Sequence, residues 1–168
     1  DLCCGTGCIG VSLAKLGGFE VTFGDISPDC LALARENAAL NGVSGKFLLT
    51  DMFSDISGSF DLICINPPYI PTSELASLQA EVKREPRLAL DGGADGLDFY
   101  RLLTAHYRDA LRPGGVAMLL TSRYTLDKRS ETMRADLARK AELVGVVRLP
   151  SSTFARQAGT EAVTDVLV

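Results

Sequence analysis

The chain has little of the material from which catalytic metal sites are built. It has one histidine, His106, and no pair of cysteines with CxxC spacing, so the ligand pattern of a zinc site is missing. Cys4 and Cys8 would need a third cysteine at the position of Val11 to hold the iron–sulfur cluster of radical chemistry. We therefore expect a mechanism without a metal.

Long apolar runs and a secretory leader are missing as well. No apolar run approaches the roughly 18 residues of a membrane span, and no basic-then-apolar segment precedes the first motif. The five cysteines are an odd number and mostly lie inside apolar stretches, unlike a secreted disulfide framework. These features predict a cytoplasmic protein without membrane contact. We expect reduced thiols in the core at Cys3, Cys4, Cys8, Cys30 and Cys64.

The composition is that of one compact domain over residues 1–168. Of the 168 residues, 46% are hydrophobic, and 17 basic against 21 acidic side chains give a net charge of -4. The charge is uneven: residues 1–122 carry 9 basic and 15 acidic side chains, or -6, and residues 123–168 carry 8 and 6, or +2. Only Asp1 to Cys4 precede a glycine-rich turn where a buried strand normally stands, so we expect a truncated first strand.

Short apolar runs alternate with segments of helical period, which is the pattern of a parallel sheet with helices on both faces. The predicted fold class is α/β, with a Rossmann-like sheet of seven mostly parallel strands. We expect helices over 8–16, 28–40, 98–111 and 130–142, strands over 20–24, 46–49, 60–65, 116–120, 144–149 and 164–168, and a turn at 113–115.

Polar residues stand at or near the ends of successive expected strands. They are Asp1, Asp25, Asp51 and Asn66. Ligands of parallel α/β sheets bind at the carboxyl ends of the strands, so this placement predicts that the four residues share one site.

A GxGxxG pattern spans Gly5–Gly10, and Asp25 follows Gly5 by 20 residues, as in nicotinamide dinucleotide sites. Two features favour S-adenosyl-L-methionine instead: an acidic residue, Asp1, four positions before Gly5, and the tetrapeptide Asn66-Pro-Pro-Tyr69 after an expected strand. Each feature alone also fits a ligand-free turn or a loop carboxylate. Their combination favours the S-adenosylmethionine site.

The tetrapeptide suits a planar NH2 acceptor, whose delocalised lone pair makes it a poor nucleophile. The side-chain oxygen of Asn66 and the carbonyl of Pro67 can accept both N–H bonds and aim the nitrogen. Pro68 stiffens the turn, and Tyr69 can stack on the flat acceptor. Catalysis then rests on positioning and electrostatics and needs no general base.

The cofactor side follows similar physics. The glycine turn lets the backbone approach the methionine portion, and Asp25 can accept from two ribose hydroxyls. Asp51 and Met52 can border the adenine. His106 lies in an amphipathic segment and is expected to be structural.

The sequence resembles the peptide chain release factor glutamine N5-methyltransferase family over about its first 118 residues. The residues that carry the resemblance are Asp1–Gly10, Asp25–Pro28, Asn66–Pro71, Glu85–Gly93 and Asp95–Arg101. The stretch from Glu85 to Arg101 is the most distinctive, because many amino-methyltransferases share the tetrapeptide.

The resemblance implies a class I S-adenosylmethionine-dependent methyltransferase whose substrate is a release factor glutamine. The family's helical amino-terminal domain, implied to help dock the release factor, is absent from these residues. The predicted catalytic residues are Asn66, Pro67, Pro68 and Tyr69, and the predicted cofactor-binding residues are Asp1, Cys3, Cys4, Gly5, Thr6, Gly7, Asp25, Asp51, Met52 and Asn66.

The tail resembles another family. Residues 121–128, 147–150, 154 and 159–165 are similar to the end of N6-adenine DNA methyltransferase domains. Glutamine amides and adenine amines are both planar NH2 groups, so the tetrapeptide leaves the acceptor open. Release factor glutamine is the first hypothesis, and DNA adenine, contacted through the basic tail, is the alternative. Two further hypotheses remain: a chain that binds the cofactor without turnover, and a nicotinamide-dependent enzyme.

Overall fold

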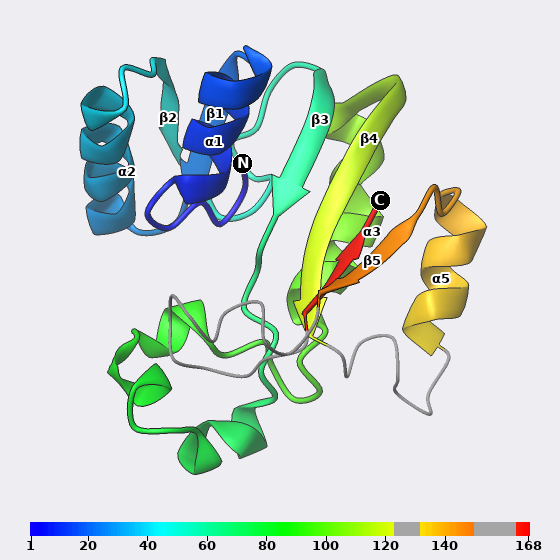
Figure 1. The fold of residues 1–168 in the computed structure, drawn as a ribbon. Helices are drawn as coiled ribbons and strands as arrows, with labels where there is room; N and C mark the ends of the chain where they lie inside the picture. Colours follow the sequence, from blue (N-terminus) through cyan, green and yellow to red (C-terminus); the bar gives the residue numbers. More distant parts are fainter. Residues whose placement is uncertain (123–131, 150–163) are drawn as a thin grey trace. The chain divides into compact units, whose positions relative to one another are not determined.

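A computed structural model of the chain describes residues 1–122, 132–149 and 164–168 (Figure 1). The chain divides into two compact units. Unit 1 comprises Asp1–Asn66 and His106–Ala117, and unit 2 comprises Pro67–Ala105 and Met118–Val168. In unit 1 the elements follow the order helix, strand, helix, strand and strand along residues 8–65, as the sequence predicts.

The two helices of unit 1 begin and end at the predicted signals. Helix α1, Cys8–Gly17, ends at Gly18, whose φ of 67° places it in the left-handed region that favours glycine. Helix α2, Pro28–Leu40, starts after Ser27, whose side chain accepts the Cys30 N–H at 3.3 Å. Proline at the first helical position completes this start.

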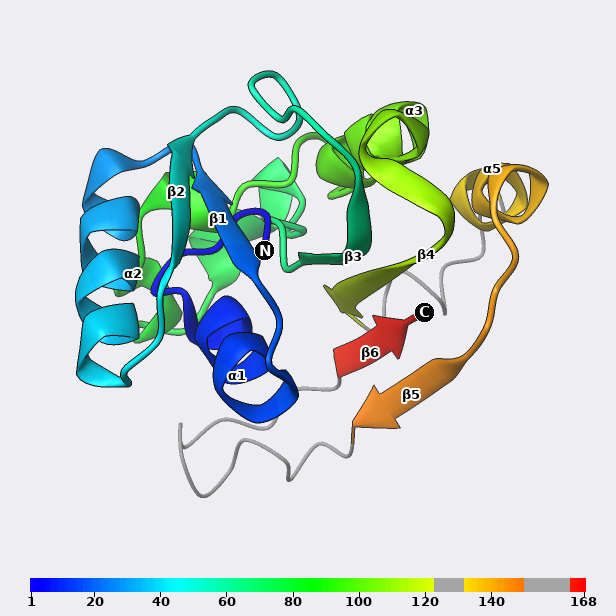
Figure 2. The same cartoon turned by 90° about the horizontal axis from the view of Figure 1, so that it is seen from above.

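Strands β1, Val21–Asp25, and β2, Gly45–Leu49, pair in parallel, side by side in Figure 2. Strand β3, Phe60–Ile65, has the predicted bounds, and Leu2 forms isolated parallel bridges to β1 and β3. The Phe23 and Phe47 rings stack with centroids 4.7 Å apart. The core between the helices and β1 consists of Cys4, Val11, Val21, Phe23, Leu31, Ala34 and Ala38.

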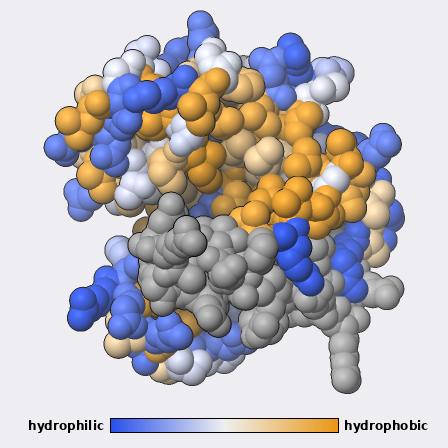
Figure 3. Space-filling model, viewed as in Figure 1, coloured by the Kyte–Doolittle hydropathy of each residue, from blue (hydrophilic) through white to orange (hydrophobic). Residues whose placement is uncertain are grey.

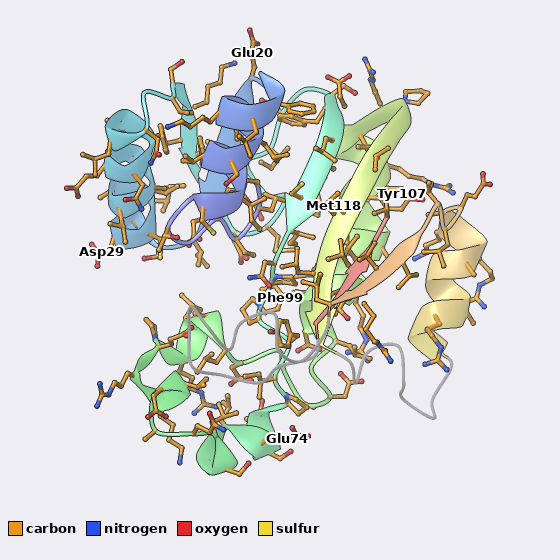
Figure 4. The ribbon with its side chains drawn as sticks, viewed as in Figure 1. Glu20, Asp29, Glu74, Phe99, Tyr107 and Met118 are labelled. Carbon is orange, nitrogen blue, oxygen red and sulfur yellow. The ribbon has the colours of Figure 1, made fainter. Side chains whose placement is uncertain are left out.

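Between β3 and the next α-helix, the chain forms three short 3-10 helices that the sequence did not predict. They are η1, Thr72–Ser77, which carries Glu74 (Figure 4), η2, Val82–Arg84, and η3, Arg87–Ala89. Helix α3, Asp98–Ala110, follows close to its predicted bounds.

Strand β4, Leu111–Ser122, corrects the prediction of a turn at 113–115 followed by a separate strand. The strand starts before Pro113 and continues through Gly114, whose φ is 76°. Proline is tolerated near the start of a strand, and a glycine with positive φ marks a local irregularity, so the signals for a turn did not end the strand.

The last elements are α5, Thr132–Lys140, β5, Val146–Leu149, and β6, Thr164–Leu167. Strand β6 is antiparallel to both β4 and β5, in a sheet of order β3-β4-β6-β5. The part of the chain that the structure describes holds six strands, so the predicted seventh is not confirmed. The predicted tail motifs at 123–128, 150, 154 and 159–163 lie outside the described residues.

Hydrophobic side chains gather around β5 on the face shown in Figure 3. In and just before this strand, Leu143, Val144, Val146 and Val147 are exposed. No helix among the described residues is long and apolar enough to cross a membrane.

All five cysteines, which lie in the described part of the chain, are free thiols. Cys4 and Cys64 are buried as predicted, and Cys3 and Cys30 are partly buried. The prediction was wrong for Cys8, which is exposed because it opens α1 on the solvent side of the glycine turn.

Candidate active site

The glycine turn before α1 is shaped by the left-handed conformations of Gly5 and Gly7, with φ of 53° and 76°. The Gly7 N–H donates to the Cys4 carbonyl at 2.8 Å, which closes the turn. A Cβ on Gly7 would lie 2.9 Å from the Cβ of Ala34, so only glycine lets α2 approach. A Cβ on Gly5 would meet no heavy atom of the described residues within 4 Å beyond its chain neighbours, so this side of the turn is open.

Two side chains hold the turn from outside. The Gly5 N–H donates to Oδ2 of Asp25 at 2.8 Å, and Nδ2 of Asn37 donates to the Thr6 carbonyl at 2.9 Å. Asn37 lies one helical turn beyond Ala34, so α2 both packs against the turn and anchors it. The sequence did not predict the role of Asn37, because an asparagine in a helix carries no local signal for a bond to a distant backbone carbonyl.

Asp25 ends β1 and already accepts two backbone N–H groups. Its Oδ2 accepts from Gly5, and its Oδ1 accepts from Ser27 at 2.9 Å. A carboxylate offers about four lone-pair sites, so capacity for two ribose hydroxyls is left. The structure therefore gives Asp25 a second function, which is to fix both flanking loops.

Asp1 lies under the start of α1, where its Oδ2 accepts the Gly10 N–H at 2.8 Å. Its Oδ1 is buried and has no hydrogen-bond partner among the described residues. Asp1 thus supports the turn, and its role in cofactor binding stays a prediction.

Cys3 and Met52 lie against each other, with Sγ and Sδ 3.7 Å apart. Both have positive φ, 53° and 51°, which is unusual for residues other than glycine and recurs at functional sites. Burial, followed by the nearby charges of Asp25 and Asp51, raises the pKa of the Cys3 thiol to about 12. This thiol is therefore a neutral packing group and not a nucleophile.

Met52 is held by a residue that the sequence did not single out. The buried Thr50 hydroxyl donates to the Met52 carbonyl at 3.1 Å and accepts the Asp55 N–H at 3.1 Å. Met52 is itself buried, whereas Asp51 is exposed. These bonds stabilise the strained conformation of the loop after β2.

The tetrapeptide follows β3. Asn66 is exposed and belongs to unit 1, while Pro67 and Pro68 are buried and Tyr69 is partly buried in unit 2. Burial, with a smaller contribution from the negative charge of Glu85, raises the pKa of the Tyr69 phenol above its ordinary value of 10. The phenol therefore stays neutral at physiological pH.

The residues of unit 1 fit the predicted cofactor. They offer an open glycine turn, a carboxylate with unused lone pairs at Asp25, and the buried sulfur surface of Cys3 and Met52. All ten predicted cofactor-binding residues belong to this unit. Their individual roles stay predictions.

The model of the Methyltransferase small domain family matches residues 1–88. The chain belongs to this family. A release factor glutamine methyltransferase of Deinococcus radiodurans is 45% identical over 139 residues, which cover 82% of this chain and 48% of that protein. A putative protein N5-glutamine methyltransferase of Methanocaldococcus jannaschii is 35% identical over 146 residues, covering 87% of this chain and 72% of that protein.

These relatives confirm the resemblance that the sequence showed. The chain spans about half the length of the Deinococcus relative, and 43% of a release factor glutamine methyltransferase of Geobacter sulfurreducens to which it is 47% identical over 122 residues.

Solved structures agree on the fold. The ribosomal protein L11 methylase of Lactobacillus delbrueckii has a TM-score of 0.65 at 22% identity, covering 99% of this chain and 66% of that chain. A putative class I S-adenosylmethionine-dependent methyltransferase of Listeria monocytogenes has a TM-score of 0.64 at 18% identity, covering 98% of this chain and 50% of that chain. The predicted α/β fold of a class I methyltransferase is confirmed, whereas the seven strands and the truncated first strand stay predictions. The fold and the family together confirm S-adenosyl-L-methionine as the cofactor.

Proposed function

We propose that the chain is the catalytic part of an S-adenosylmethionine-dependent methyltransferase that methylates the side-chain amide of a glutamine in a peptide chain release factor. The observation that carries this proposal is the tetrapeptide Asn66-Pro-Pro-Tyr69, which directly follows β3. The relatives of the chain that are named release factor glutamine methyltransferase support the choice of substrate. A substrate of translation termination also favours a cytoplasmic location.

In this reaction the amide nitrogen forms a bond to the methyl carbon while the carbon–sulfur bond breaks and its electron pair stays on sulfur. When bound, S-adenosyl-L-methionine supplies a methyl group made electrophilic by the positive sulfonium. Asn66 Oδ1 and the Pro67 carbonyl accept the two N–H bonds of the glutamine amide, which aims its lone pair. The nitrogen then loses one proton to solvent.

Tyr69 contributes a flat surface for the amide plane. Its phenol remains uncharged because burial raises its pKa, so it adds no negative charge that would compete for the sulfonium. Unit 1 meanwhile holds the cofactor through the open turn at Gly5 and through Asp25.

Replacement of Asn66 tests the proposal. Asn66→Ala removes one of two acceptors, and we expect methyl transfer to an unmethylated release factor to fall by on the order of a hundredfold or more. The affinity for S-adenosylhomocysteine, measured by calorimetry, should fall far less, by no more than about tenfold, because Asn66 is only one of the ten predicted cofactor-binding residues. The control is Asn41→Ala, an exposed asparagine after α2 that is outside the proposed site. Unchanged turnover in Asn66→Ala contradicts the proposed role.

Relatives favour the release factor over DNA as the acceptor. Two properties of the tail favour DNA adenine: its resemblance to the end of N6-adenine DNA methyltransferase domains and its net charge of +2 over residues 123–168. Transfer to DNA would fall steeply with added salt, which separates the two acceptors.

A further inference from the structure

The most distinctive stretch of the sequence, Glu85–Arg101, has no role in the mechanism above. It contains η3, the loop after it and the first residues of α3, all in unit 2. We call this segment the strap. Its contacts show which part of the chain it holds.

The strap pairs with the backbone that follows the tetrapeptide. The Ile70 N–H donates to the Leu90 carbonyl at 3.0 Å, and the Gly92 N–H donates to the Ile70 carbonyl at 2.8 Å. The Thr72 N–H donates to the Gly93 carbonyl at 2.9 Å. Three bonds within three residues fix the register of the strap against the chain that leaves Tyr69.

Two glycines let the strap approach the tetrapeptide itself. A Cβ on Gly92 would lie 2.8 Å from Tyr69 Cα and 2.9 Å from the Pro68 carbonyl oxygen. A Cβ on Gly96, whose φ is 77°, would overlap the Tyr69 carbonyl oxygen. The backbone of the strap therefore lies directly against Pro68 and Tyr69, where no larger residue fits.

Asp91 is the centre of the side-chain network. Its Oδ1 accepts from the Thr72 hydroxyl at 2.6 Å and from the Gly93 N–H at 3.1 Å. Its Oδ2 accepts from Nε and Nη2 of Arg87 at 3.1 and 2.9 Å. These donors, with the Thr72 hydroxyl first, hold the pKa of the Asp91 carboxyl below its usual range. One carboxylate thus ties both sides of the backbone pairing together.

Arg101 closes the other end of the strap. Its guanidinium donates to both oxygens of Asp95, at 3.0 and 2.7 Å, and to Asp98 at 2.9 Å. Asp95 also accepts the Leu97 N–H at 3.2 Å, which fixes the loop after Gly96. The charged residues of the strap therefore bond mainly to one another.

We propose that the strap positions the acceptor tetrapeptide, with Asp91 as its central positioning residue. This inference rests on the proposed function. The strap sets the backbone of Pro68 and Tyr69, so the acceptor surface is preformed before the substrate arrives. Its charges serve this internal network, and a role in docking the release factor by charge is the competing outcome of the test.

The test compares Asp91→Ala with Asp91→Asn. Asparagine keeps an oxygen that can accept from Thr72 and Gly93, whereas alanine removes it. In Asp91→Ala we expect kcat for release factor methylation to fall by on the order of tenfold to a hundredfold, because small misplacements of a reacting group have such effects. Asp91→Asn should recover most of the rate, and the affinity for S-adenosylhomocysteine should not change in either. The control is Asp61→Ala, an exposed carboxylate paired with Arg112 in unit 1.

A second readout does not depend on activity. The chain has four tyrosines, so ring-labelled tyrosine gives a simple carbon NMR spectrum in which Tyr69→Phe identifies the Tyr69 signal. We expect this signal to move in Asp91→Ala and to stay in Asp61→Ala. An unmoved Tyr69 signal in Asp91→Ala overturns the proposal. A raised KM that depends on salt, with normal kcat, also overturns it in favour of docking by charge.

Failure of the proposed function gives a different result. If the wild-type chain methylates no release factor glutamine, the substrate is wrong, and the Tyr69 signal alone then decides whether the strap positions the tetrapeptide.

Discussion

The cofactor turn of unit 1 and the strap of unit 2 are both built on glycines and carboxylates, but they are stabilised differently. The turn packs on a buried apolar core, with a Gly7–Ala34 approach and the Gly5 N–H bonded to Asp25. The strap buries Gly92, Gly96 and Tyr100 but exposes most of its charged side chains. Backbone hydrogen bonds to Ile70 and Thr72 hold it, together with partly exposed ion pairs such as that of Arg87 with Asp91. Burial is the stronger and less salt-sensitive source of stability. We therefore expect the stability of the turn to depend little on salt, and the contribution of the strap's ion pairs to fall as salt is added.

The largest effect is expected where α1 packs on β1. A Cβ at Gly10 would overlap the Phe23 ring, so Gly10→Val should lower the free energy of unfolding by about 3 kcal/mol. Urea titration measures this loss. The matched control is Gly145→Ala, where a Cβ meets no described atom within 4 Å and no change is expected. Equal stability of the two variants would contradict the tight packing of the turn.

The next effect concerns Asp25. Asp25→Ala removes the acceptors of the Gly5 and Ser27 N–H groups as well as those predicted for the ribose. Charged hydrogen bonds contribute about 1.5–3 kcal/mol each, so losing the two to the ribose should lower the affinity for S-adenosylhomocysteine by about a hundredfold or more. Calorimetry checks this, with Asp29→Ala, in the first turn of α2 (Figure 4), as the control. A comparable loss in both variants would mean that the effect is general to acidic residues near α2.

The smallest effect is expected for the exposed side of the strap. Arg87→Ala removes the ion pair with Asp91. The Arg87 side chain is 71% exposed, so the melting temperature should fall only slightly. Melting curves at low salt and at about 1 M salt separate a loss of the ion pair from a loss of buried packing, because salt screens exposed ion pairs. The difference from wild type should vanish at high salt. A large loss that persists there would show that the strap is stabilised as the turn is.

Much of unit 1 follows from local signals. Ser27 with Pro28 starts α2, Gly18 ends α1, and an apolar run interrupted only by Asp61 gives β3 its bounds. Each signal acts through the backbone of its own residues, so no knowledge of the tertiary structure is needed.

Other features depend on contacts between distant residues. The short 3-10 helices of unit 2 have no apolar period, and the antiparallel direction of β6 does not appear in its apolar run. The anchors Asn37 and Thr50 act on backbone atoms of other elements. The predicted residues around the turn all belong to unit 1, but the sequence did not predict the hydrogen bonds of Asn37 and Thr50 that hold them.

The strap shows a similar division. The sequence marked Glu85–Arg101 as distinctive by resemblance alone, because its pattern predicts no helix or strand before the helix that begins at residue 98. The structure supplies the physical reason, since Gly92 and Gly96 lie against Tyr69 and Asp91 joins the two segments.

We propose that this chain transfers a methyl group from S-adenosylmethionine to a glutamine amide. Labelled methyl transfer in one reaction that holds unmethylated release factor and unmethylated DNA, followed by mass spectrometry of the labelled product, tests this proposal. We expect label on a glutamine side chain of the release factor, and its loss in Asn66→Ala. Label on DNA adenine, with none on the release factor, would show that the acceptor is wrong.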